Sequence, residues 1–177
     1  MGETTKFGVF DTSNPLLLDE TDRKILRLLQ ANGRMSIAAL SDEVGLTPTP
    51  LRQRIEKLEQ GGAIEGYAAR VNAAAVGRST LAFVHVSLRE HTLAVHQAFL
   101  EHIVSLSDVV EVHHVAGDQD FLLKVVVRDI AEFEAFILHR LPAPGSGVGR
   151  INSTFVLSSA RDRGPIPIDD PNREVRR

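Results

Sequence analysis

The sequence predicts an α+β protein, in which an N-terminal helix-turn-helix domain is joined to a C-terminal ferredoxin-like βαββαβ domain. Three observations support this fold class. Apolar residues recur at helical spacing three times between residues 19 and 60. Alternating apolar segments, interrupted by two helical patterns, fill residues 81–157. A segment of small and polar residues, 72–80, separates the two regions.

Composition excludes several classes of protein. Hydrophobic residues make up 43% and charged residues 24% of the 177-residue chain, the ordinary balance of a globular protein. No apolar run approaches about 18 residues and no secretory signal is evident, so we expect no membrane span. The absence of cysteine excludes disulfides and thiolate chemistry and fits the cytoplasm. The net charge of −3 still allows a local basic stripe.

Five segments are expected along the chain. The two terminal segments lack apolar periodicity, and the last one holds nine charges and three prolines. The expected boundaries are a flexible arm at 1–16, a winged helix-turn-helix domain at 17–71, a linker at 72–80, a βαββαβ domain at 81–160 and a disordered tail at 161–177. Within the first domain, residues 63–71 are predicted to be extended and are the candidate for a small hairpin, the wing.

Start and stop signals define two helices before residue 46. Asp19 is a good N-cap for the first helix, whose first turn is acidic and whose stop is Gly33. Ser36 is the expected cap of a second, shorter helix that ends at Gly45. The apolar stripes are Ile25, Leu26, Leu28 and Leu29 in the first helix and Ile37, Leu40 and Val44 in the second.

A third helix is predicted to begin after Thr47. Pro48 and Pro50 fall in its first turn, where backbone N–H groups have no intrahelical acceptor. Only Gly45 and Leu46 separate the second helix from this cap, and so short a connection is typical of a helix-turn-helix. The inner stripe and the stop of the third helix are Leu51, Ile55, Leu58 and the pair Gly61-Gly62.

The outer face of the third helix predicts a contact with DNA. It carries short polar side chains near its N-terminus and cations on its flanks, as a recognition helix does toward base edges and phosphates. Gln53 suits adenine, and an arginine suits guanine or phosphate. The candidate DNA-binding residues are Thr47, Pro48, Thr49, Pro50, Arg52, Gln53, Arg54 and Lys57. Three cations are few, so two or more copies on repeated half-sites are expected. A protein-interaction module with a solvated outer face is the alternative.

The C-terminal half alternates between strand and helix patterns. Strands are predicted at 81–88, 109–115, 121–128 and 148–157, and helices at 92–105 and 130–141. This βαββαβ order is that of a ferredoxin-like fold, in which strand 121–128 is central and helices cover one face of the sheet. Because that strand is apolar on one face and half apolar on the other, a second copy of the domain is the simplest cover for the open face.

The turn at 117–120 is the candidate ligand site of this domain. Gly117 permits a positive φ or a close backbone approach, and Asp118 and Asp120 place two carboxylates near one turn. Exposed N–H groups would bind a carboxylate and an aspartate would bind an ammonium, which suits a zwitterionic amino acid. A hairpin turn selected only for its conformation is the alternative.

Metal, enzyme and RNA interpretations receive little support. His113 and His114 are adjacent on a strand and point to opposite faces, while His91 and His96 are five residues apart and miss the i, i+4 spacing of a helical ligand pair. We therefore expect no metal, no cofactor and no catalytic residues, since nucleophile elbows, P-loops and HExxH motifs are absent too. Two aromatic residues on the central strands are too few for an RNA-stacking sheet.

Residues 17–157 resemble the Lrp/AsnC family of leucine-responsive and asparagine-responsive regulators. The resemblance covers about four-fifths of the chain. The matching features are Leu18-Asp19, Asp22, Ile25-Leu26, Gly33-Arg34, Leu40, Val44-Gly45-Leu46, Thr47-Pro48-Thr49-Pro50, Arg54, Leu58-Glu59, Gly66-Tyr67 and the segment VHHVAGDQDFLLKV. The resemblance implies a DNA-binding transcription regulator that is a homodimer, often assembled into octamers, with a C-terminal domain of the RAM/ACT type.

The family resemblance also implies an amino-acid effector near the Gly-Asp-x-Asp turn, between dimers. The candidate effector-binding residues are Gly117, Asp118, Gln119, Asp120, His114 and Ser153. Two departures bear on the pocket: Ile151 and Ser153 stand where the family often has threonines, and the loop 143–147 is longer than usual. A DNA-organising protein without an effector and an amino-acid-binding module with a protein-docking helix-turn-helix remain the alternatives.

Overall fold

The computed structural model describes residues 16–168 and divides the chain into two compact units. The first unit contains described residues 16–69 and 163–168, and the second is Arg70–Asp162. Most of the expected N-terminal arm and the end of the expected tail, residues 1–15 and 169–177, lie outside the described residues. In the described part of the chain, no helix is long and apolar enough to cross a membrane.

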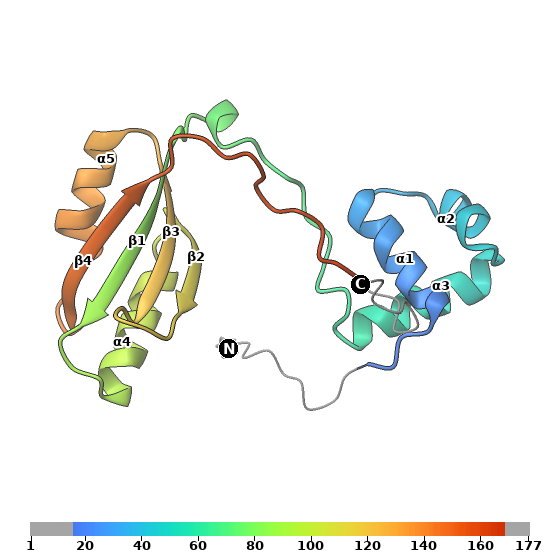
Figure 1. Ribbon diagram of the computed structural model, residues 1–177, viewed down its shortest axis with the longest axis horizontal. Helices are drawn as coiled ribbons and strands as arrows, with labels where there is room; N and C mark the ends of the chain where they lie inside the picture. The colour runs from blue at the N-terminus through green and yellow to red at the C-terminus, as the bar shows by residue number, and fades with distance from the viewer. Residues whose placement is uncertain (1–15, 169–177) are drawn as a thin grey trace, which may run out of the picture. The chain divides into compact units, whose positions relative to one another are not determined.

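Three helices form the first unit: α1 (Glu20–Ala31), α2 (Ile37–Val44) and α3 (Pro48–Gln60) (Figure 1). The predicted N-caps of α1 and α2 are confirmed, because Asp19 accepts from the Asp22 N–H in a full capping box and Ser36 accepts from the Ala39 N–H. Gly45 ends α2 with a φ of +79°, a conformation that favours glycine. Thr47 is the N-cap of α3 but makes no side-chain cap bond.

The core of the first unit joins all three helices through the apolar stripes that the sequence predicted. Its buried residues are Ile25, Leu26, Leu40, Leu51 and Leu58. The stop of α1 differs slightly from the prediction: the C-cap is Asn32, one residue before Gly33. Such shifts are within the usual fraying of helix ends.

The expected wing is absent from the described structure as a paired hairpin. Residues 63–71 contain no strand. Ile64 instead packs against the helical core, with its N–H bonded to the Leu58 carbonyl at 3.1 Å. The Tyr67 hydroxyl donates to Glu59 Oε1 at 2.9 Å. An isolated two-stranded hairpin is marginally stable, and these contacts hold the segment against α3 without one.

The second unit has the predicted βαββαβ order. Its elements are β1 (Thr80–Leu88), α4 (Leu93–Val104), β2 (Val109–His114), β3 (Phe121–Val127), α5 (Ile130–Ala135), which continues as a π-helical turn (Phe136–Arg140), and β4 (Val148–Phe155). The sheet order is β2-β3-β1-β4 with antiparallel neighbours, so β3 is central, as expected (Figure 1). A single 3₁₀ turn, Ala74–Val76, interrupts the expected linker.

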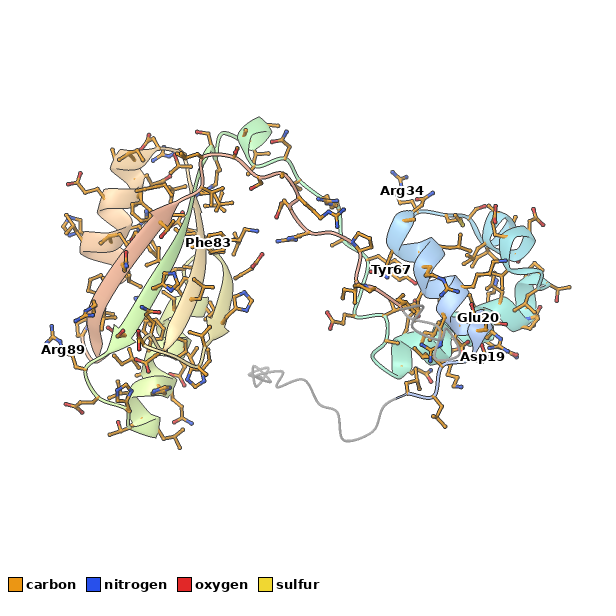
Figure 2. The ribbon with its side chains drawn as sticks, in the orientation of Figure 1. Asp19, Glu20, Arg34, Tyr67, Phe83 and Arg89 are labelled. Atoms are coloured by element: carbon orange, nitrogen blue, oxygen red, sulfur yellow. The ribbon has the colours of Figure 1, made fainter. Side chains whose placement is uncertain are left out.

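One face of this sheet is covered by α4 and α5, and the other is open. Alternate β1 residues such as Val84 and Val86 are fully buried with Phe99 of α4 and Phe133 of α5 in one core. The residues between them along β1, among them Phe83, are only half-buried (Figure 2). This face therefore combines apolar side chains such as Phe83 with polar ones such as His85, and the described residues cover it only in part.

The described end of the expected disordered tail follows a defined path along α1. The Ile166 backbone exchanges two hydrogen bonds with the Gln30 side-chain amide, at 2.7 and 3.1 Å. Ile168 packs against the helical core, and its carbonyl accepts from Arg27 at 3.3 Å. Two isoleucines, flanked by prolines whose rings restrict the backbone φ angle, let this otherwise polar segment lie extended against the helix.

Candidate functional site

The first turns of α3 present the predicted DNA-binding surface. The side chains of Thr47, Pro48, Thr49, Arg52, Gln53 and Lys57 are exposed, whereas Pro50 and Arg54 are half-buried. Buried Leu51 and Leu58 fix which side of α3 faces the core. Among the described residues, Arg52 and Lys57 form no ion pair, so both cations are available to phosphates. The N-terminal end of the helix adds a favourable dipole, while Pro48 and Pro50 have no N–H and the Leu51 N–H is bonded to the Thr47 carbonyl at 3.3 Å.

Arg54 has a different role from the other predicted cations. Its Nη1 lies 2.6 Å from Asp19 Oδ2 and 2.7 Å from Asp22 Oδ1. The hydrogen bond from the Asp22 N–H, together with Arg54, holds the pKa of Asp19 below its ordinary value of 3.8. Arg54 therefore joins α3 to the N-terminus of α1, and its predicted contact with DNA stays a prediction.

The β2–β3 turn, where the sequence predicts the effector site, is fastened to the end of β1. The Asp120 N–H donates to the Val86 carbonyl at 3.0 Å, and Asp120 Oδ2 accepts from the Leu88 N–H at 2.7 Å. The Ser87 hydroxyl donates to the Asp118 carbonyl at 3.3 Å. Asp120 thus holds the turn in place, while the side chain of Asp118 is exposed to solvent. Gly117 has a φ of +146°, which confirms the predicted need for glycine.

Of the other two predicted effector residues, the structure brings only His114 to this turn. Its ring stacks on Phe121 at a centroid distance of 5.1 Å, directly after the turn. Ser153 lies on β4 and pairs with Val84, so β1 separates it from the turn. Its side chain shares the helix-covered face with Val84. The order and register of β3, β1 and β4 determine this separation, and a sequence motif contains no information about either.

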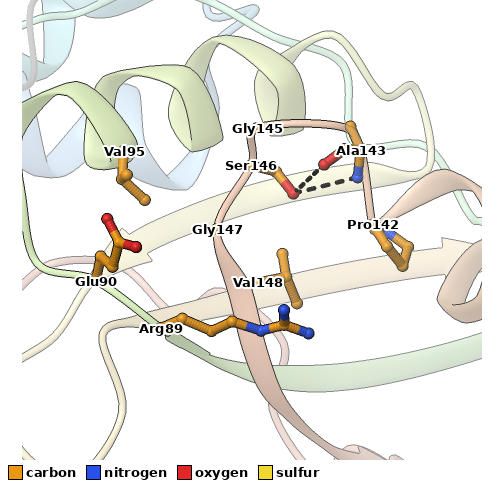
Figure 3. A pocket seen from close by; sticks show the side chains of 9 residues that line it. All are labelled: Arg89, Glu90, Val95, Pro142, Ala143, Gly145, Ser146, Gly147 and Val148. Carbon is orange, nitrogen blue, oxygen red and sulfur yellow. Dashed lines mark hydrogen bonds between the residues drawn. The ribbon is translucent and has the colours of Figure 1, made fainter.

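A pocket of about 420 Å³ opens beside the same end of β1 (Figure 3). Its lining residues are Arg89, Glu90, Val95, Pro142, Ala143, Gly145, Ser146, Gly147 and Val148. The Ser146 hydroxyl closes the loop by accepting from the Ala143 N–H and donating to its carbonyl, at 3.2 and 2.8 Å. Arg89 and Glu90 place one positive and one negative charge at the rim of the pocket. Sequence reasoning missed this pocket, because its parts come from a strand end, a helix and a loop that share no motif.

The chain matches two family models, one in each unit. Residues 18–59 match the AsnC-type helix-turn-helix domain, and residues 81–166 match the Lrp/AsnC ligand binding domain. The Bkd operon transcriptional regulator of Pseudomonas aeruginosa is 38% identical over 151 residues, which are 85% of this chain and 98% of that protein. The leucine-responsive regulatory protein of Escherichia coli K12 is 40% identical over 154 residues, 85% of this chain and 92% of that protein.

Solved structures show the same similarity. A transcriptional regulator from Neisseria meningitidis, crystallised in complex with L-Met, superposes with a TM-score of 0.80 at 32% identity, covering 85% of this chain and 97% of that one. AsnC of E. coli superposes with a TM-score of 0.76 at 25% identity, covering 84% of this chain and 97% of that one. These matches are to transcriptional regulators and not to enzymes.

Proposed function

Because the chain belongs to the Lrp/AsnC family of helix-turn-helix transcriptional regulators, we propose that residues 17–71 bind double-stranded DNA and that residues 81–160 bind an amino acid and assemble the protein. Residues 72–80 link the two domains. A DNA-binding regulator of this kind acts in the cytoplasm, where its operators lie. The observation that carries the proposal is the exposed polar N-terminal surface of α3, where Arg52 and Lys57 form no ion pair with any described residue, in a chain that also has the ligand-binding domain.

The DNA contact uses the major groove. The exposed N-terminal residues of α3 meet base edges, Gln53 among them, while Arg52 and Lys57 meet phosphates on the two sides. Two free cations neutralise few phosphates, so one copy binds weakly. Specific binding therefore requires paired helices on repeated half-sites.

The DNA proposal is tested with a labelled duplex from upstream of the protein's own gene. We expect Arg52→Ala and Lys57→Ala each to reduce the slope of log affinity against log salt by about 0.9, one phosphate contact each. Lys24→Ala, which removes an exposed cation from α1 of the same unit, is the matched control. Equal slopes in all four proteins would contradict binding through α3.

The effector is a small amino acid held at the β2–β3 turn. Asp118, whose carboxylate is exposed, receives the ammonium group, and the N–H groups around Gly117 receive the carboxylate. Gln119 and the ring of His114 border the same turn, and Asp120 fixes it on β1. Ser153 does not belong to this group because β1 lies between. Methionine is the first candidate, since the similar Neisseria regulator was crystallised with L-Met.

A thermal-shift screen of the twenty amino acids tests the effector proposal, because binding to the folded form raises the midpoint of unfolding. Asp118→Asn should abolish the shift given by the active amino acid and preserve DNA binding. Glu134→Gln, an exposed carboxylate on α5, is the control. If no amino acid shifts the midpoint and DNA binding persists, the protein is an effector-independent DNA-organising protein. If amino acids bind and DNA does not, it is a binding module.

Assembly uses the open face of the sheet. On this face Leu81 and Phe83 of β1 are apolar and His85 is polar, and Lys124 is paired with Glu111 and Asp162 at 3.1 and 3.3 Å. A second copy of the domain covers this face and makes a homodimer, and the family resemblance supports further assembly into octamers. The effector then changes the geometry between dimers and so the spacing of paired recognition helices.

A further inference from the structure

Three side chains that can bind a metal ion converge beside the β2–β3 turn. They are His91, His96 and Asp120. The five-residue spacing of the two histidines argues against a helical ligand pair, but that criterion does not apply when one of them precedes the helix. In the structure α4 begins at Leu93 with Thr92 as its N-cap, so His91 lies in the preceding loop. The loop lets it turn toward His96 and toward Asp120, which immediately precedes β3.

The distances within this cluster suit a metal ion. One ligand atom from each residue lies within 4.8 Å of the other two. His91 Nδ1 is 3.3 Å from Asp120 Oδ1, and the rings of His91 and His96 are 6.3 Å apart between centroids. Ligand atoms at about 2.0–2.1 Å from a tetrahedral zinc ion are about 3.3–3.4 Å from one another. The His91–Asp120 pair already has this spacing, and small rotations of the partly exposed histidines bring in the third ligand.

The surroundings orient these ligands. Asp120 Oδ2 is occupied by the Leu88 N–H at 2.7 Å, which leaves Oδ1 directed at His91. A hydrogen bond of this kind positions carboxylate ligands in metal sites. The His96 ring is held at 5.3 Å from His114 and 5.4 Å from Phe121, yet among the described residues its nitrogens have no hydrogen-bond partner. His96 is only half-buried, so its ring is accessible to a metal ion.

We propose that His91, His96 and Asp120 bind a divalent transition-metal ion such as Zn²⁺. Two imidazoles and one carboxylate favour zinc, cobalt or nickel over magnesium or calcium, which prefer sets of oxygen ligands. Three protein ligands leave a fourth position open to water or to a small ligand. The bound ion fastens the loop before α4 to the β2–β3 turn. The proposal goes beyond the amino-acid response, although the two sites share Asp120.

The test is a titration of the metal-free, full-length protein, without an affinity tag, with Zn²⁺ followed by calorimetry. Co²⁺ is the spectroscopic probe, because a tetrahedral N,N,O site gives intense visible bands. We expect one ion per chain and a raised midpoint of thermal unfolding. His91→Ala, His96→Ala and Asp120→Asn should each weaken Zn²⁺ binding by tenfold or more, as the loss of a ligand requires. Asparagine still accepts the Leu88 N–H, so the turn stays folded.

His139→Ala is the matched control, because this histidine is exposed on the π-helical turn and lies outside the cluster. The titration contains neither amino acid nor DNA, so its result is independent of the proposed function. The proposal is overturned if the wild-type protein binds no Zn²⁺, if the His91 and His96 variants bind as tightly as wild type, or if His139→Ala loses binding equally.

Discussion

At the scale of single residues, ion pairs decide which cations of the first unit are available to DNA. Arg54 lies between Asp19 and Asp22, and the side chain of Asp22 is only 3% exposed. Arg52 and Lys57 extend into solvent from the same helix. The three cations that look alike in the sequence therefore differ in the structure: Arg54 holds α3 to α1, and Arg52 and Lys57 are exposed and proposed to contact phosphates.

Arg54→Ala and Lys57→Ala should have different effects on the free energy of unfolding. Removing Arg54 leaves a buried carboxylate unpaired, so we expect a loss of about 2 kcal/mol in the free energy of unfolding, less than the roughly 3–5 kcal/mol of a fully buried pair because Arg54 is one-third exposed. Lys57→Ala should leave stability within about 0.5 kcal/mol of wild type. Urea unfolding followed by circular dichroism measures both. Equal stabilities would show that the Arg54 pairs contribute nothing.

Asp19 gives the first unit a dependence on pH. Its folded-state pKa lies below the ordinary 3.8, so its ionised form stabilises the fold above that value, and the contribution is lost as pH falls through the folded pKa. Asp19→Asn keeps a capping side chain without the charge. The variant should melt below wild type near neutral pH, and the difference in midpoint should vanish in acid. A difference that is constant with pH would exclude the charge as its cause.

At the scale of elements, the loop before β4 is shaped by glycines that are not equivalent. Gly145 and Gly147 have φ values of +80° and +65°. A Cβ on Gly145 would meet nothing within 4 Å, whereas one on Gly147 would lie 2.3 Å from Cγ1 of Val95 on α4. Gly147 thus lets the start of β4 approach α4 and sets one wall of the pocket (Figure 3).

Alanine at these two positions separates backbone strain from packing. Gly145→Ala should cost about 1 kcal/mol, the penalty for a positive φ alone. Gly147→Ala should cost a further 1–3 kcal/mol or so, because Val95 must move. Urea unfolding of the two variants gives the comparison. If the two losses are equal, α4 and the loop are not in the close contact described.

At the scale of the whole molecule, the sheet packs against a core on one face and is only half-buried on the other. Helices α4 and α5 bury most of one face, where Phe155 of β4 stays 39% exposed, and the half-buried face around Phe83 matches what a second copy would cover (Figure 2). Such a dimer also pairs two recognition helices, which the small number of free cations on α3 requires.

Phe83→Asp should convert the dimer to a monomer, because a charge would be buried in the interface without a partner. Leu138→Asp is the control: this leucine is 58% exposed on the π-helical turn, away from the open face. Light scattering after size-exclusion chromatography gives the mass of each protein. A wild-type monomer, or a dimer that survives Phe83→Asp, would contradict assembly through this face.

The sequence determined the local structure of this protein and the family to which it belongs. The caps Asp19 and Ser36, the start of α3 at Pro48 and the βαββαβ order all follow from periodicity and from turn residues, which act within a few positions along the chain. The glycine of the β2–β3 turn was predictable for the same reason.

Tertiary structure alone decided which distant side chains meet. Arg54 contacts Asp22 across 32 residues, His91 and His96 of the α4 region meet Asp120 of the β2–β3 turn, and β1 separates Ser153 from that turn. The wing was predicted and did not form as a hairpin, because packing of Ile64 against the helices took its place. Periodicity specifies which face of each element is buried, but the pairing of polar groups depends on how those elements cross in space.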